Sequence, residues 1–385
     1  MDAGALHAER ALQRARAWLM PQARAGFPDC VHEMNFPRWA GFSAGPERQS
    51  SDLFARAVLA GLLLDIADDA LGDPAWQDEL RRLARAEADR LAAARLPDRT
   101  GGWGYFPALP ELPPDLDSLA GAIGLFARIA TMHLPLCTAA IDLALSARCA
   151  DGSLHTWLIG VDDPPAARAL MRFGVDRFWG DTVDVEVCAR FHAALALAEP
   201  TLHRSAIEDG IRHLLQAQRD DGTWPCTWYC SPLVATEFAL SLLDRRPAGA
   251  GARRRALRHL IDQQHAEGGW GPIDDPGVDT ALAVALLARA DPTESPDAAH
   301  AVARGVAWLC DRQTLRGTWK PAPWIRMEVG RAQGQAGYVA TFGCESLSTA
   351  LGLRALVRAA ARRREASQGT PLVGPSSARW GSESG

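Results

Sequence analysis

Lysine is almost absent from this chain, and neither sign of charge dominates it. The 385 residues contain 41 Lys and Arg against 46 Asp and Glu, a formal net charge of -5 at pH 7, and the pI is about 6.1. Domains that bind nucleic acid present clustered positive charge, so this balance argues against such a partner. The arginines lie mainly on stretches with helical periodicity, where we interpret them as a solvated face.

Long apolar runs are also missing. No stretch reaches the roughly 18 consecutive apolar residues of a membrane-spanning helix, and residues 1–10 lack the apolar core of a signal peptide. The sequence therefore predicts no integral membrane span and a cytoplasmic location. The eight cysteines are scattered, and several fall inside helical stretches. This spacing favours reduced, buried thiols over a disulfide framework.

The composition, 48% hydrophobic and 23% charged, is that of an ordinary globular protein. Proline, glycine and serine become frequent only after about residue 364. We therefore predict one domain over residues 1–362, followed by a disordered tail over residues 363–385.

A turn motif, Gln-x-x-x-Gly-x-Trp, recurs along the chain between polar and apolar helical stretches. Three good copies lie at Gln218/Gly222/Trp224, Gln264/Gly268/Trp270 and Gln313/Gly317/Trp319. Degraded copies lie at Pro97/Gly101/Trp103, Arg148/Gly152/Leu154 and Gln22/Gly26/Pro28. A turn that recurs in fixed helical context indicates a repeated supersecondary unit, here in about six copies.

Each unit has a charged, half-solvated helix before the glycine and an Ala- and Leu-rich helix after it, apolar nearly all round. We interpret these as outer and inner helices. Six such pairs could stack as an open solenoid or close into a ring. Because the N-terminal end shows no polar capping repeat, the sequence favours an all-α fold, a single closed α/α toroid of about six inner and six outer helices.

A carboxylate stands near the start of every predicted inner helix. These residues are Asp52, Asp117, Glu186, Glu237, Asp279 and Glu345. The simple interpretation is that each acid caps its helix and interacts with the helix dipole. In a closed ring, however, all inner helices begin at the same end, so the acids would surround one mouth. Crowded, poorly hydrated carboxyls raise one another's pKa and can stay protonated as proton donors.

The second repeat carries Asp115 and Asp117 directly after a double proline. With the Gln-x-x-x-Gly-x-Trp turns, this segment resembles squalene–hopene cyclase and its relatives, the prenyltransferase and squalene-oxidase repeat superfamily. It is similar to the Asp-x-Asp-Asp segment of class II terpene cyclases. The resemblance implies that Asp117 is the general acid that protonates an alkene or epoxide, and that Asp115 hydrogen-bonds to it. The family's last Asp is Ser118 here, an uncharged hydroxyl.

Such chemistry needs an apolar cavity with aromatic faces near the developing positive charge. The turn tryptophans are expected to join outer to inner helices, so the better cavity candidates are Tyr105, Phe106, Trp179, Trp228 and Trp324. With the acids Glu186, Glu237, Asp279 and Glu345 they form the predicted substrate-binding set. A chain with residues for one barrel fits a small isoprenoid or prenylated molecule, with no cofactor and no metal.

Two other functions remain open at this point. A carbohydrate-active α/α toroid also places carboxylates and tryptophans around a cleft, and it predicts an open polar groove. A non-catalytic binding protein for an apolar ligand predicts that Asp117 merely caps its helix.

Two soft-ligand pairs, Cys226/Cys230 and Cys30/His32, could bind zinc if joined in space. The long insertions in the first, third and sixth repeats are predicted lids over the cavity.

Overall fold

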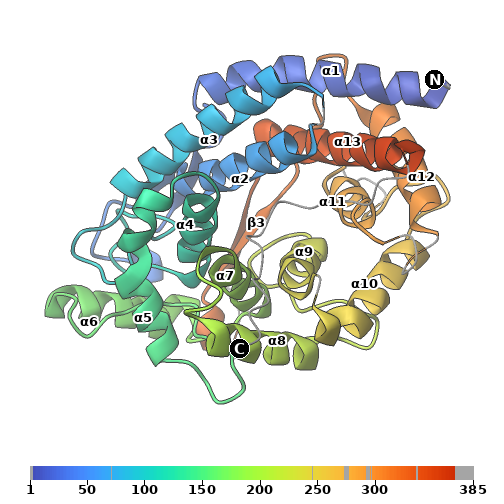
Figure 1. Cartoon of the computed structure of the whole chain (residues 1–385). Helices are drawn as coiled ribbons and strands as arrows, with labels where there is room; N and C mark the ends of the chain where they lie inside the picture. Colours follow the sequence, from blue (N-terminus) through green and yellow to red (C-terminus); the bar gives the residue numbers. More distant parts are fainter. Residues whose placement is uncertain are drawn as a thin grey trace.

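The alternation of outer and inner helices is confirmed. The computed structural model describes residues 3–70, 72–244, 246–272, 277–291, 295, 297–334 and 337–368. The inner helices there are α2 (Leu53–Asp69), α4 (Leu116–Ile129), α7 (Val185–Ala198), α9 (Pro232–Leu243), α11 (Val278–Leu287) and α13 (Glu345–Gln368). The outer helices are α1 (Ala3–Arg24), α3 (Pro74–Ala93), α5 (Thr138–Ser146), α8 (Arg204–Ala217), α10 (Ala250–Asp262) and α12 (Ala298–Arg312). Figure 1 shows them as two concentric rings.

The pattern of apolar residues explains which helices lie inside. Nearly every residue of α11 is buried, whereas α3 buries only one stripe that includes Trp76, Leu80, Ala84 and Leu91. A helix that is apolar all round needs neighbours on every side, and an amphipathic one needs a single partner surface. The inner ring is therefore the core of the protein.

The ring is closed. Each inner helix contacts the next, and the last, α13, packs against the first inner helix, α2, and against α1. The amide of Gln313 in the last turn donates a hydrogen bond of 2.8 Å to the carbonyl of Ala11 in α1. Gln218 and Gln264 make the equivalent bond to Ala252 and Ala301 of the following outer helices. The repeated glutamine thus joins successive units, including the last to the first.

The turn glycines and tryptophans have separate tasks. Gly317 has a φ of +87°, and a Cβ there would lie 2.6 Å from the Arg14 carbonyl oxygen of α1, so only glycine fits. Trp319 is buried and donates from its ring nitrogen to the carbonyl of Leu309 in α12. The expectation that the turn tryptophans join the helix layers is confirmed.

The long insertions contain structure that an all-helical pattern does not predict. Two antiparallel hairpins pair β1 (His32–Asn35) with β2 (Arg48–Ser51) and β3 (Ile325–Val329) with β4 (Tyr338–Phe342). The third-repeat insertion holds α6 (Pro165–Gly174) and the π-helical turn η3 (Val175–Trp179). Short 3-10 turns complete the chain at η1 (Arg38–Ala40), η2 (Thr131–Cys137), η4 (Pro247–Gly249) and η5 (Arg331–Gln333).

The three insertions touch one another. The Tyr338 hydroxyl donates to the carbonyl of Asn35, and the Gly330 amide donates to the carbonyl of Phe178. At the other end of the chain, α13 runs to Gln368, so the first six residues of the predicted tail are helical. The rest of that prediction, residues 369–385, lies outside the described residues.

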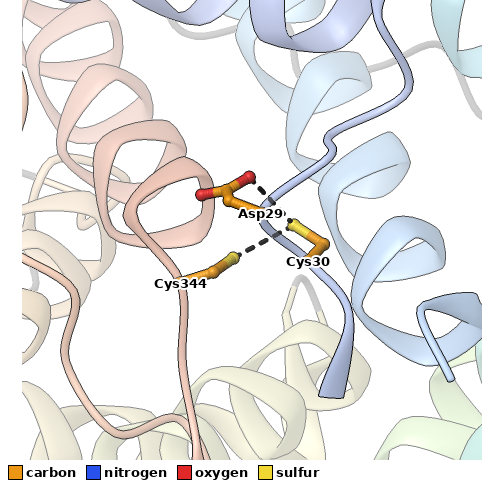
Figure 2. A group of neighbouring side chains, drawn as sticks. All are labelled: Asp29, Cys30 and Cys344. Atoms are coloured by element: carbon orange, nitrogen blue, oxygen red, sulfur yellow. Dashed lines mark hydrogen bonds between the residues drawn. The ribbon is translucent and has the colours of Figure 1, made fainter. Parts of the chain in front are cut away.

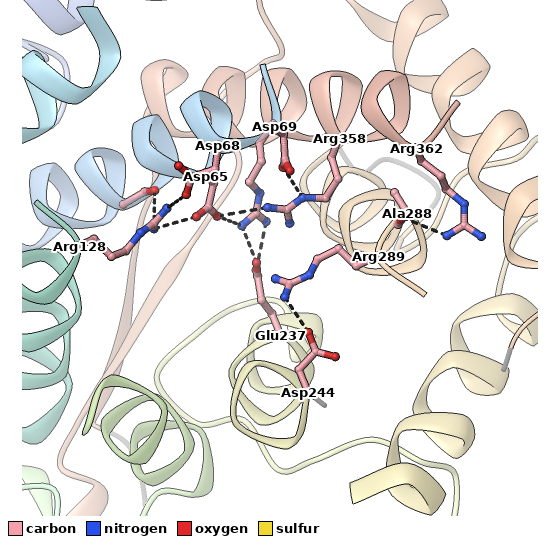
Figure 3. Close-up of polar contacts among 12 residues, drawn as sticks. Asp65, Asp68, Asp69, Arg128, Glu237, Asp244, Ala288, Arg289, Arg358 and Arg362 are labelled. Atoms are coloured by element: carbon pink, nitrogen blue, oxygen red, sulfur yellow. Dashed lines mark hydrogen bonds and ion pairs between the residues drawn. The ribbon is translucent and has the colours of Figure 1, made fainter. Parts of the chain in front are cut away.

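Paired charges occupy the ring toward the C-terminal ends of the inner helices (Figure 3). Asp65 of α2 accepts from Arg128 of α4 at 2.8 Å and from Arg354 of α13 at 3.1 Å. Arg354 also binds Glu237 of α9, and Arg358 donates to Asp69 at 2.6 Å. Burial alone would raise the pKa of Asp65, but the neighbouring arginines lower it below its ordinary range. We call this set of ion pairs the charged floor.

Candidate active site

Asp115, and not Asp117, caps helix α4. Its two carboxylate oxygens accept from the Ser118 backbone amide at 2.6 Å and from the Ser118 hydroxyl at 2.8 Å. The two prolines before it hold the chain extended up to the cap. The serine at the last motif position therefore orients Asp115.

Asp117 lies in the first turn of α4 and is buried. Its Oδ1 accepts from Arg190 Nη1 of α7 at 2.7 Å, and its Oδ2 accepts from the Tyr229 hydroxyl at 2.5 Å. The two aspartates thus bind different partners. The resemblance implied a hydrogen bond between them, and the structure corrects this, because Ser118 occupies both oxygens of Asp115.

The two carboxyls nevertheless influence each other through space. Burial, and then the charge of Asp117, raise the pKa of Asp115 to about 7, while the bonds from Ser118 and the charge of Arg190 lower it in part. Asp115 can therefore carry a proton close to neutral pH.

Arg190 is the sixth residue of α7, a helix that is otherwise mostly apolar. Its guanidinium lies 5.3 Å from the ring centre of Phe54 and 5.2 Å from that of Phe238. A cavity of about 10 Å³, lined by Phe54, Ser118, Gly121 and Arg190 among others, has the space of about one water molecule. The signal for Arg190 in the sequence was a single arginine within an apolar run.

Glu186 forms a second buried acid near Asp117. Its Oε1 accepts from the backbone amides of Thr227 and Trp228 at 2.6 and 2.8 Å. Its Oε2 is buried and has no partner among the described residues. Burial, followed by the charge of Asp184, raises the pKa of Glu186 to about 7. Like Asp115, Glu186 can carry a proton at neutral pH.

Asp184 lies two residues before Glu186 and binds both Trp228 and Arg331. One of its oxygens accepts from the Trp228 ring nitrogen at 2.7 Å, and the other accepts from Arg331 at 3.0 Å. Burial would raise the pKa of Asp184, but Arg331 and the hydrogen bonds lower it. Arg331 in turn lies over the Trp228 ring. Sequence analysis did not select Asp184 or Arg331, because their partners lie far away in the chain.

The predicted aromatic residues are all buried at this end of the ring. Trp324 packs its ring edge-on to Tyr229, 5.6 Å between centroids, and Trp228 adjoins Tyr229 in the chain. Tyr105 packs on Phe54. Phe106 and Trp179 lie further out, both against Phe36 of the first insertion. Trp228, Trp324 and Tyr105 therefore lie within one or two side chains of Asp117.

The predicted ring of acids is only partly present. Asp117 and Glu186 are buried, and burial raises the pKa of the half-buried Asp279. Glu345 instead pairs with Arg316, and Asp52 pairs with arginines of its own and the next helix. The prediction for Glu237 was wrong. It is the sixth residue of α9 and belongs to the charged floor, because α9 begins at Pro232, five residues earlier.

The predicted zinc pairs do not come together. Cys30 Sγ lies 3.0 Å from Cys344 Sγ, and Asp29 lies beside them (Figure 2). Among the residues that the structure describes, these three are the one group of His, Cys, Asp or Glu side chains close enough to share a metal ion. Asp29 also accepts from the amide and hydroxyl of Ser346, so it serves as a cap for α13.

Comparison with known proteins agrees with this architecture. The family model of the squalene-hopene cyclase C-terminal domain matches residues 99–328. Drimenyl diphosphate synthase from Streptomyces showdoensis is 28% identical over 61% of this chain and 41% of its own length. Squalene--hopene cyclase from Zymomonas mobilis is 24% identical over 70% of this chain and 44% of its own. The chain thus spans less than half the length of these relatives.

A solved structure covers the whole ring. The type II terpene cyclase from Scytonema, in complex with geranylgeranyl dihydroxybenzoate, superposes with a TM-score of 0.66 over 93% of this chain and 99% of its own, at 18% identity. It therefore shares the fold. The fold is an α/α toroid with an acid pair at the start of one inner helix, and the family model matches residues 99–328. This chain belongs to the squalene–hopene cyclase C-terminal domain family.

Within the described part of the chain, no helix is both long and apolar enough to cross a membrane.

Proposed function

We propose that this protein catalyses the acid-initiated cyclisation or isomerisation of a small isoprenoid or prenylated molecule. The observation that carries the proposal is the buried pair of Asp115 and Asp117 beside aromatic side chains, in which burial and the charge of Asp117 raise the pKa of Asp115 to about 7. A neutral carboxyl next to aromatic faces can donate a proton and shield the cation that follows. The relatives named above support the same chemistry.

In the proposed reaction the protonated carboxyl of Asp117 gives its proton to one carbon of a double bond and becomes a carboxylate. The other carbon becomes a carbocation, and a second double bond attacks it to form a ring, or the cation loses a neighbouring proton directly. Loss of a proton at the end restores the charge balance. Trp228, Trp324 and Tyr105 are the proposed aromatic neighbours of the cation, and Glu186 is a nearby acid that can take part in substrate binding.

The charged floor changes where the substrate must lie. The sequence suggested an apolar cavity within the barrel, but Arg190, Glu237 and Arg354 fill its interior with charge. A hydrocarbon gains nothing from displacing paired charges. We therefore place the isoprenoid at the mouth, between the inner-helix N-termini and the three insertions. A cytoplasmic location is also part of this proposal.

The decisive experiment incubates the purified chain in heavy water with isoprenoids of ten to twenty carbons, as free alcohols, diphosphates and prenylated hydroxybenzoates. Product analysis by mass should show one deuteron in a cyclised or isomerised product. Asp117→Asn should abolish it, whereas Asp142→Asn, an exposed acid on α5, should not. If a folded wild-type protein binds these molecules without converting them, the proposal is wrong and a binding protein remains.

A carbohydrate-active function predicts an open polar groove around the carboxylates. The buried position of Asp117, which accepts from the Tyr229 hydroxyl, does not favour it. Oligosaccharide hydrolysis by wild type, lost in Asp117→Asn, would revive that alternative.

A further inference from the structure

Arg190 is a cation in direct contact with Asp117, and its surroundings hold it in one place. Its guanidinium lies between the rings of Phe54 and Phe238. A Cβ added at Gly121 of α4 would lie 3.1 Å from Arg190 Nη2, so the glycine leaves just enough room for it. From this position Arg190 Nη1 contacts Asp117 Oδ1 at 2.7 Å and the Tyr229 hydroxyl at 3.3 Å.

We infer that Arg190 is a positioning residue that strengthens the acid at Asp117 by stabilising the carboxylate left behind after proton transfer. This inference rests on the proposed function. Donating a proton to a double bond turns a neutral carboxyl into an anion in a buried site, where the loss of hydration would oppose the step. Arg190 provides a charge-assisted hydrogen bond to one oxygen of that anion, and Tyr229 provides a hydrogen bond to the other.

The preorganised position of Arg190 matters for the rate. A donor that is already aimed at the developing charge needs no rearrangement during the reaction. Here the two flanking rings and the glycine fix the guanidinium before any substrate arrives. Since Arg190 is the sixth residue of α7, it lies about 8 Å beyond the helix start at about 1.5 Å per residue.

The same charge also directs the substrate. A guanidinium repels a carbocation, so the reacting double bond must approach Asp117 from the side of the mouth, near Trp228 and Trp324. The groups that act electrostatically on Arg190 are Asp117, Tyr229 and Asp115. Of these, Asp117 is in direct contact with the guanidinium. The inference therefore predicts that removing this contact changes the pH dependence of turnover.

The test compares wild type with Arg190→Met, which removes the charge, and Arg190→Lys, which keeps it. With a substrate that the wild type converts, Arg190→Met should lower kcat by about a hundredfold, within the range of general acid catalysis. KM should change little. The alkaline limb of its pH–rate profile should move to higher pH, since an unpaired carboxyl holds its proton longer. Arg190→Lys should restore most of kcat and the original profile.

A second readout does not depend on turnover. Carbon-13 NMR of the aspartate carboxyls should show that one carboxyl titrates at higher pH in Arg190→Met than in wild type. The carboxyl signal that is missing in Asp117→Asn identifies this carboxyl as Asp117. If Arg190→Met does not fold, Arg190→Gln, which keeps a hydrogen-bond donor without the charge, replaces it in both experiments. Turnover within about twofold of wild type with unchanged pH dependence would overturn the inference. If the NMR titration moves in Arg190→Met as expected but the wild type converts none of the substrates, the proposed function is wrong and the contact between Arg190 and Asp117 stands.

Discussion

The neutral carboxyl of Asp115 should make the protein less stable as the pH rises. Its pKa is about 7 in the folded chain, against an ordinary value of 3.8. The native state therefore binds more protons than the unfolded chain between about pH 4 and pH 7. The stabilisation is fully present below about pH 4 and is lost as the pH rises through about 7. The difference corresponds to about 4 kcal/mol, at about 1.4 kcal/mol per pH unit.

Asp115→Asn removes this dependence, because the carboxamide stays neutral and keeps an oxygen that can accept from the Ser118 amide. Its free energy of unfolding should match that of wild type near pH 4 and exceed it by about 4 kcal/mol near pH 8. At the same time turnover should fall, since the carboxamide removes the proton that Asp115 carries beside Asp117. Urea unfolding at a series of pH values, with Asp142→Asn as the control, measures the first effect.

A constant difference between Asp115→Asn and wild type across this pH range would refute the reasoning. It would mean that the carboxyl is ionised in the folded chain, and that Asp115 is only a helix cap. A gain in stability together with a loss of activity would instead identify Asp115 as a group kept neutral for function at the expense of stability.

Two further predictions concern the ring itself. Gly317→Ala should lower the free energy of unfolding by about 2–5 kcal/mol in chemical denaturation, because it adds left-handed strain and a contact with Arg14. Gly61→Ala, where a Cβ meets nothing within 4 Å, should be neutral or stabilising. Arg354→Met should cost about 3–5 kcal/mol, because it removes the buried cation that pairs with the half-buried acids Asp65 and Glu237 of the charged floor. Adding Glu237→Gln should recover part of that loss in thermal unfolding, whereas purely additive losses would contradict the pairing.

The repeat pattern was sufficient to predict the closed toroid, because each feature acts within one unit or between neighbours. Gly317 needs a left-handed turn, and Trp319 reaches a carbonyl ten residues earlier. The insertion hairpins were not predicted as strands, because strands of four or five residues are too short to show a clear alternating pattern. Glu237 was misplaced because α9 begins at Pro232, so that this acid lies in the second turn of the helix and not in the first.

The sequence by itself determined the fold class, the position of the acid pair at the start of an inner helix and the location of the insertions. Only the tertiary structure decided what each acid does. Arg190 and Tyr229 lie 73 and 112 residues from Asp117 in the chain, and closing the ring brings them to its two oxygens. A local motif can specify a carboxyl, but its charge state and direction depend on burial and on partners that only the folded ring supplies.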